Sequence, residues 1–175
     1  MEPVDSTAFR IRPARPADLA DCAVLVSLHS GGTPEEAGRR LRRELGRADR
    51  ELLVAHAGDD EAGPVIGYGR LTWFTSGGAD GEAPSGAYLG GLVVSPAHRG
   101  RGVGTALTHA RMRSAFEEHG EGAVWYVANA RNHASIALHE RFGFREVTRD
   151  FWYPGITFEG GTGVLFRALA PTGGH

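Results

Sequence analysis

The chain has 175 residues, 41% of them hydrophobic, and a formal net charge of −2 at neutral pH, which is typical of one globular domain with a substantial core. This charge balance argues against nucleic acid or an anionic membrane as a partner. The N-terminus has no apolar run of signal-peptide or membrane-spanning length, and the one cysteine, Cys22, cannot form an internal disulfide. We therefore expect a single cytoplasmic domain over residues 1–175, with its core at about residues 8–170.

The N-terminal quarter of the chain predicts a strand followed by two helices. Phe9–Arg12 alternates apolar and charged residues, as in a half-buried strand. Residues 19, 22, 23 and 26 are apolar at helical spacing, which places Cys22 on a buried face, where a lone cysteine usually acts as a small hydrophobe rather than a nucleophile. After a Gly-Gly pair, Thr33–Glu36 reads as a capping box with proline at the first helical position.

Two further strands are predicted at Leu52–His56 and Val65–Phe74, joined as a hairpin by a Gly-Asp-rich turn. The connector Thr75–Gly86 that follows is long and rich in Gly, Ser and Ala, so we expect it to be mobile. Asp80 and Glu82 are its two carboxylates.

The segment Leu92–Leu107 reads as strand, glycine-spaced loop and helix. The loop Arg99–Gly104 has glycine at every second position, so a bulky ligand could approach its backbone closely. The helix that begins in the loop would direct its positive N-terminal end at an anion. The glycines do not fit G-x-G-x-x-G, and no Lys-Ser/Thr pair follows Gly104, which disfavours a dinucleotide or ATP site.

The last third of the chain is predicted to hold three strands, at Val124–Ala128, Arg145–Trp152 and Gly163–Leu169. One helix is predicted after the first of them, at Ser135–Phe142. The helix lies within Asn132–Phe144, which reads NHASIALHERFGF.

Two stretches together resemble the GNAT N-acetyltransferase superfamily. Arg99-x-x-Gly102-x-Gly104 behind Val94-Ser95-Pro96 is similar to its motif A, and Asn132–Phe144 is similar to its motif B. They cover about a third of the chain. The resemblance implies an α+β fold: a mixed, mostly antiparallel central sheet, helices on both faces, and a splayed strand pair that admits the arm of the co-substrate, acetyl-CoA.

The resemblance also implies which residues bind acetyl-CoA, with no metal. Backbone N–H groups of the strand end would pair with pantetheine and polarise the thioester, the loop would hold the pyrophosphate, and Asn132 would contact the arm or only cap the following helix. The implied residues are Leu92, Val93, Val94, Arg99, Gly100, Arg101, Gly102, Val103, Gly104, Thr105 and Asn132.

Two positions depart from the family pattern. The glutamate that often acts as general base is replaced by Gly90, which leaves ordered water or the carboxylates of Asp80, Glu82 and Glu159 as candidates. The tyrosine that protonates the leaving thiolate is replaced by His139, which is either the general acid or a packed histidine, with Tyr126 and Tyr153 as other donors.

We therefore expect an N-acetyltransferase acting on a primary amine of a small molecule, such as an amino acid, a polyamine or an amine antibiotic. The alternative is a non-catalytic acyl-CoA-binding regulatory module. Arginines on the second helix, at 39, 40, 42, 43 and 47, would either attract an acidic acceptor or form i, i+4 pairs with Glu35 and Glu36 on a solvated face. The oligomeric state stays open, with a homodimer as one alternative.

Overall fold

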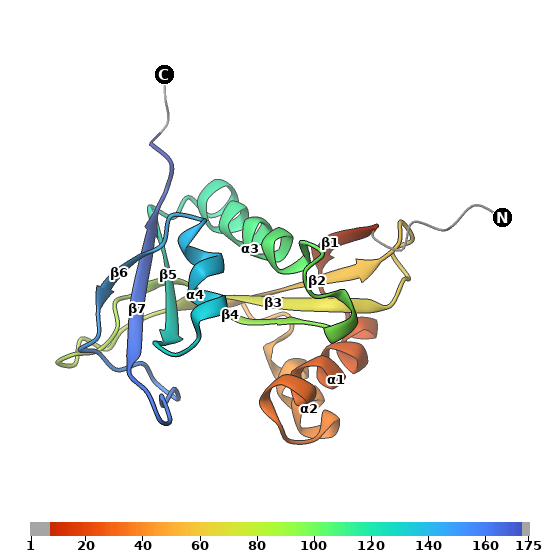
Figure 1. Cartoon of the computed structure of the whole chain (residues 1–175), viewed down its shortest axis with the longest axis horizontal. Coiled ribbons are helices and arrows are strands. Elements are labelled where there is room, and N and C mark those ends of the chain that lie inside the picture. The colour runs from red at the N-terminus through yellow and green to blue at the C-terminus, as the bar shows by residue number, and fades with distance from the viewer. Residues whose placement is uncertain (1–7, 173–175) are drawn as a thin grey trace. The chain divides into compact units, whose positions relative to one another are not determined.

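The structure is a computed structural model that describes residues 8–172, and within them it shows one mixed, mostly antiparallel sheet with four α-helices (Figure 1). The α+β class expected from the sequence is confirmed. The strand order is β1-β2-β3-β4-β5-β7-β6, for β1 (Phe9–Pro13), β2 (Arg50–Ala57), β3 (Val65–Phe74), β4 (Gly86–Val94), β5 (Ala123–Asn129), β6 (Arg145–Thr148) and β7 (Gly163–Leu169). The helices are α1 (Leu19–Ser30), α2 (Pro34–Glu44), α3 (Val103–Arg113) and α4 (His133–Glu140).

The described residues fall into two compact units. Unit 1 takes residues up to 70 together with 91–111, and unit 2 takes 71–90 together with the residues from 112 onward. Strands β3 and β4 each contribute residues to both units. The expectation of a single domain stays a prediction.

In unit 1, β2 is buried on both faces, because its residues alternate between two hydrophobic clusters. Leu52 and Val54 pack with α1 and α2, whereas Leu53 and Ala55 pack with α3. Helices therefore cover both faces of the sheet in this unit, with α1 and α2 on one face and α3 on the other (Figure 1).

The predicted end of α1 and start of α2 are confirmed, but α2 ends at Glu44, so Arg47, which was expected on this helix, lies beyond its end. Helix α1 ends at Gly31, whose φ of 76° lies in the left-handed region that favours glycine. At the start of α2 the Thr33 side chain accepts from the Glu36 N–H, and the Glu36 carboxylate accepts from the Thr33 N–H. These two bonds satisfy donors that the helix itself cannot.

In unit 2, β5 alternates buried and half-buried residues and pairs along its whole length with β7. Val124, Tyr126 and Ala128 join the cluster that packs α4, while Trp125 and Val127 pack on the other face. The parallel ladder to β4 is short, since it covers only Ala87–Leu89. The expected separation of the two strands beyond it stays a prediction.

One expectation for unit 2 is corrected by the structure. Strand β6 ends at Thr148 and not at Trp152, because the Thr148 hydroxyl accepts from the Asp150 N–H and turns the chain. Trp152 instead forms an isolated bridge to Glu82, and its indole donates to the Asp80 carbonyl at 2.9 Å. The connector between β3 and β4, expected to be mobile, is thus hydrogen-bonded to the segment after β6.

Candidate functional site

The loop between β4 and α3 lies wholly in unit 1 and is fixed at both ends. After β4 the Ser95 N–H donates to the Ile66 carbonyl of β3 at 2.8 Å, and a short 3-10 turn follows at Pro96–His98. The Arg99 Nε then donates back to the Val94 carbonyl at 3.3 Å. Of the strand residues implied in binding, Val93 is buried against the α1–α2 side, while Leu92 and Val94 pack on the α3 side.

Two glycines give this loop a backbone that other residues would adopt only with strain. Gly100 has a φ of 73° and Gly102 a φ of 82°, both in the left-handed region. A methyl group added at either position would meet no heavy atom within 4 Å. The space beside the loop backbone is therefore open, as a bound anion requires. Arg99 and Arg101 are exposed at its edge, and Thr105 is half-buried in the first turn of α3.

Helix α3 begins inside the loop, where the Gly102 carbonyl accepts from the Ala106 N–H at 2.9 Å. Val103 and Leu107 anchor it, since both are buried against β3. A methyl group at Gly67 of β3 would lie 2.9 Å from Val103 Cγ1 and 3.0 Å from Leu107 Cδ1, so only glycine lets the helix approach this closely. The positive N-terminal end of α3 is thereby held at the loop.

Sequence reasoning missed Arg111, a fully buried residue that ties α3 to β3. Its Nε donates to the Leu107 carbonyl, its Nη1 to the Arg70 carbonyl and its Nη2 to the Thr108 hydroxyl, each at 3.2 Å. Arg111 follows the buried Leu107 by four residues and therefore lies on the same helix face, which was the available signal. An arginine in an apolar row, however, is normally interpreted as an interruption of the buried face.

Asn132 and His139 lie in unit 2, Asn132 directly before α4 and His139 within it. The Asn132 side chain caps α4 by accepting from the Ser135 N–H at 3.3 Å. His139 is buried, with 1% of its surface exposed, and its Nδ1 lies 2.8 Å from the Ser135 carbonyl. Because a carbonyl only accepts, this bond assigns the ring proton to Nδ1.

The structure brings Tyr126 and Ser135 together with His139, a polar cluster that the sequence did not predict. The Tyr126 ring stacks on the His139 ring with centroids 3.7 Å apart and planes 4° apart. The Tyr126 and Ser135 hydroxyls are hydrogen-bonded to each other. Tyr126 and His139 are buried and Ser135 is half-buried. Tyr153, the other candidate donor, packs against Phe74 and Tyr88 on the opposite side of unit 2.

The candidate bases differ in how their carboxylates are held. Glu82 accepts from the Ser76 hydroxyl at 2.7 Å, and this hydrogen bond lowers the pKa of the Glu82 carboxyl group below its ordinary value. A carboxylate with a lowered pKa is a weaker base. Asp80 and Glu159 are exposed, and hydrogen bonds are found at their backbone carbonyls, to Trp152 and Asn129 respectively.

Within residues 8–172 no cluster of three or more His, Cys, Asp or Glu residues has the arrangement that could hold a metal ion. None of the helices in the same range is long and apolar enough to cross a membrane.

Comparison with known proteins gives a consistent family match. The model of the acetyltransferase (GNAT) family matches residues 22–144. An uncharacterized protein of Mycobacterium leprae (strain TN) is 29% identical over 152 residues, which are 86% of this chain and 38% of that protein. The chain therefore spans well under half of the length of this curated relative.

Solved structures share the fold at low sequence identity. Arabidopsis thaliana NAA60 in complex with a bisubstrate analogue has a TM-score of 0.72 at 19% identity, over 93% of this chain and 98% of that one. The ribosomal-protein-S18-alanine N-acetyltransferase from Escherichia coli has a TM-score of 0.67 at 20% identity, over 95% and 97%. Apo FdhC, a nucleotide-linked sugar GNAT, has a TM-score of 0.69 at 13% identity, over 94% and 88%.

Proposed function

The chain belongs to the acetyltransferase (GNAT) family, and from that premise we propose that it transfers an acetyl group from acetyl-CoA to a primary amine of a small molecule. The observation that carries the proposal is the β4–α3 loop, with two left-handed glycines, open space beside them and a helix N-terminus behind them. Acetyl-CoA would supply an activated thioester, and the chain's own groups would position it and manage protons.

The loop residues fit the diphosphate of the co-substrate. Backbone N–H groups of residues 99–105 would bind the phosphate oxygens, supported by the positive end of α3 and by the exposed Arg99 and Arg101. The N–H groups of Leu92 and Val94 would pair with the pantetheine arm, and Asn132 would contact that arm in addition to capping α4.

His139 is the proposed proton donor to the leaving thiolate, and its neighbour Tyr126 is the alternative. With Nδ1 committed to the Ser135 carbonyl, Nε2 is the nitrogen at which His139 would gain and lose a proton. The Tyr126 hydroxyl is bonded to Ser135 and could donate in its place. Substitution of each residue separates the two roles.

No side chain can remove the amine proton at the position where the family often has a glutamate, because that residue is Gly90 in this chain. Ordered water, or the exposed carboxylates of Asp80 or Glu159, would take that proton. Glu82 is the weakest of the candidates, because its carboxylate is held by Ser76 and its pKa is lowered. The proposed acceptor is an amino acid, a polyamine or an amine antibiotic.

Calorimetry with acetyl-CoA and a thiol-release assay test the proposal in two steps. The amine panel includes the proposed acceptors, a peptide with N-terminal alanine and a nucleotide-linked amino sugar, because the fold relatives named above act on a ribosomal-protein alanine and on a nucleotide-linked sugar. No heat of binding would refute the co-substrate site. Binding without thiol release across the panel would favour the alternative, a non-catalytic acyl-CoA-binding module.

The remaining expectations stay predictions: a cytoplasmic location, neither nucleic acid nor membrane as partner, and a homodimer as one alternative. Gel-shift titration with duplex and single-stranded DNA tests the first of these exclusions, since binding to a polyanion would weaken steeply with salt.

A further inference from the structure

Helix α1 is apolar on two opposite sides, although only one side faces the core of unit 1. Leu19, Cys22, Leu25 and Val26 are buried in that core. On the other side, Val24 is 46% and Leu28 71% exposed, and Ala20 one turn earlier is exposed as well. These three residues at i, i+4 and i+8 form one apolar row along the helix. A surface helix of a globular protein normally carries polar residues on this outer side.

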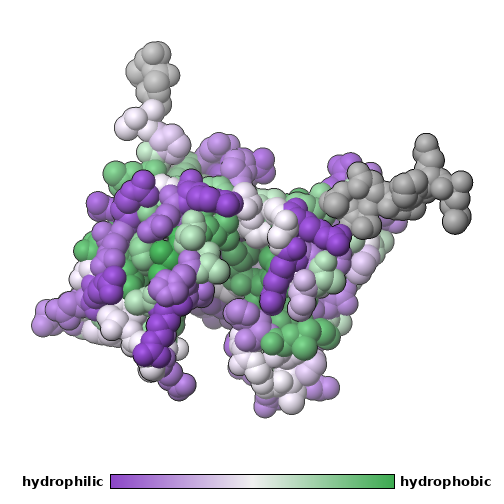
Figure 2. Space-filling model, viewed as in Figure 1, coloured by the Kyte–Doolittle hydropathy of each residue, from purple (hydrophilic) through white to green (hydrophobic). Residues whose placement is uncertain are grey.

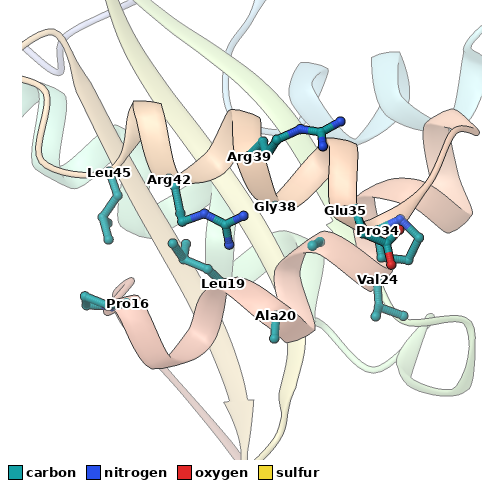
Figure 3. A pocket seen from close by; sticks show the side chains of 11 residues that line it. Pro16, Leu19, Ala20, Val24, Pro34, Glu35, Gly38, Arg39, Arg42 and Leu45 are labelled. Carbon is teal, nitrogen blue, oxygen red and sulfur yellow. The ribbon is translucent and has the colours of Figure 1, made fainter.

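Two residues of this row, Ala20 and Val24, line a groove of about 870 Å³ between α1 and α2 (Figure 3). Its lining is mostly apolar, and hydrophobic surface is visible over the α1–α2 region in Figure 2. The lining residues are Pro16, Leu19, Ala20, Ala23, Val24, Pro34, Glu35, Gly38, Arg39, Arg42 and Leu45. The charged members, Glu35, Arg39 and Arg42, follow one another at i, i+4 and i+7 along α2.

The two helices approach closely at the groove floor. A methyl group at Gly38 would lie 3.6 Å from Ala23 Cβ and 3.6 Å from Arg42 Nη1, so the Arg42 guanidinium folds back over Gly38. Within residues 8–172 neither Arg39 nor Arg42 forms an ion pair, and the i, i+4 pairs expected from the sequence with Glu35 and Glu36 are not formed. Two unneutralised guanidinium groups thus stand beside an apolar floor.

We propose that the α1–α2 groove docks an acidic amphipathic helix of a partner protein. Apolar side chains of the partner, spaced at i, i+4 and i+7, would pack along Ala20, Val24 and Leu28. Carboxylates one turn apart would face Arg39 and Arg42, to which guanidinium groups bind in bidentate fashion. A basic residue of the partner would face Glu35.

Other occupants fit these features less well. A second copy of this chain would bring the same row of Arg39 and Arg42 against itself, which charge repulsion disfavours. A membrane surface is flat, whereas a concave groove between two helices is complementary to a convex surface such as a third helix. The proposed surface lies on α1 and α2, apart from the loop assigned to acetyl-CoA, so the proposal does not depend on acetyl transfer.

The test uses two fluorescein-labelled peptides of about 18 residues, a length that allows a helix to form in water. Both carry leucines at i, i+4 and i+7, flanked by glutamates in one peptide and by lysines in the other. Fluorescence anisotropy with the full chain should show the glutamate peptide binding at least about tenfold more tightly. The double substitution Arg39→Glu and Arg42→Glu should reverse this preference, and Val24→Asp should abolish binding of both peptides.

The matched control is Arg40→Glu with Arg43→Glu, which makes the same charge change on the same helix outside the groove lining. It should keep the preference for the glutamate peptide. Circular dichroism and calorimetric binding of CoA verify that each variant is folded. Four results would overturn the proposal: equal or absent binding of the two peptides, reversal by the control pair, a concentration-dependent dimer that Val24→Asp dissociates, or binding to anionic vesicles that competes with the glutamate peptide.

Discussion

Gly102 is the residue at which backbone conformation and co-substrate binding are most directly joined. Its φ of 82° disfavours any side chain, and the open space at its Cα is where a diphosphate would approach. Gly102→Val should therefore weaken CoA binding about a hundredfold or more. Arg101→Ala removes one exposed charge that water can replace and should cost about tenfold or less, taking roughly 1.4 kcal/mol per tenfold change. Calorimetric titration with CoA measures both.

A second glycine-to-valine substitution, at a glycine outside the loop, serves as the control for backbone strain alone. Gly120→Val, at a φ of 69° with no heavy atom within 4 Å of an added methyl group, carries a similar backbone penalty in unit 2. It should lower the melting temperature and leave CoA affinity unchanged. If Arg101→Ala weakens binding as much as Gly102→Val, the backbone cradle is not the main source of affinity.

His139 and Tyr126 can be separated by rate and pH. If His139 donates the proton, His139→Ala should lower kcat about 10²-fold or more with CoA affinity nearly unchanged, and Tyr126→Phe should cost much less. A histidine donor also places the falling limb of the kcat profile at a lower pH than a tyrosine donor would, because imidazolium is a stronger acid than a phenol. His139→Tyr should restore part of the rate and move that limb upward.

The contrary results are equally definite. Normal turnover by His139→Ala with a lower melting temperature would make His139 a packing residue, as its 1% exposure and its stacking on Tyr126 allow. A large loss in Tyr126→Phe instead would assign the proton to the tyrosine. Ser135→Ala is the control for the hydroxyl that Tyr126 contacts.

At the scale of elements, the junction of β1 with α1 depends on one carboxylate. Asp18 accepts from Arg12 Nη1 at 2.6 Å, from Arg12 Nη2 at 2.9 Å and from the Arg15 N–H at 2.7 Å, and it is buried. The hydrogen bond from Arg12 is the main cause that lowers the pKa of Asp18 below its ordinary value of 3.8. Asp18→Asn should reduce the free energy of unfolding at pH 7 by about 1–3 kcal/mol, because Arg12 loses its partner.

The pH dependence follows from the direction of this pKa shift. A carboxylate whose pKa is lower in the folded state stabilises the fold above the unfolded pKa, and this stabilisation is lost as the pH falls through the folded pKa. The difference between wild type and Asp18→Asn, measured by urea unfolding, should therefore be constant from pH 7 to 5 and shrink below about pH 4. Asp59→Asn, at an exposed pair with Arg10, serves as the control and should change little.

Elements differ in how far the sequence could predict them. The helices and β2 were predictable, because apolar spacing and the Thr33–Glu36 capping box are local signals. The end of β6 was not, because Val147 to Trp152 reads as a strand until the turn at Thr148 and the bridge from Trp152 to Glu82 are known. A loop with a backbone that a ligand can approach was predicted from the spacing of its glycines alone. The stacking of His139 on Tyr126 was not, since it joins α4 to a strand whose register depends on long-range pairing.

At the scale of the whole molecule, the single cysteine reports unfolding. Cys22 is fully buried, and burial raises the pKa of its thiol to about 12, so the folded chain should react negligibly with Ellman's reagent at pH 8. Reaction then requires opening of the core, and it should follow the unfolding free energy when reclosing is fast. Acetyl-CoA, whose acylated sulfur does not react with the reagent, should slow labelling about a hundredfold at about 100 times its Kd, because ligand bound only to the native state lowers the open population by 1 + [L]/Kd. Cys22→Ala gives the blank. Rapid labelling that acetyl-CoA does not slow would show a local opening of α1, and thiol release by acetyl transfer could then not be followed in the wild-type chain with this reagent.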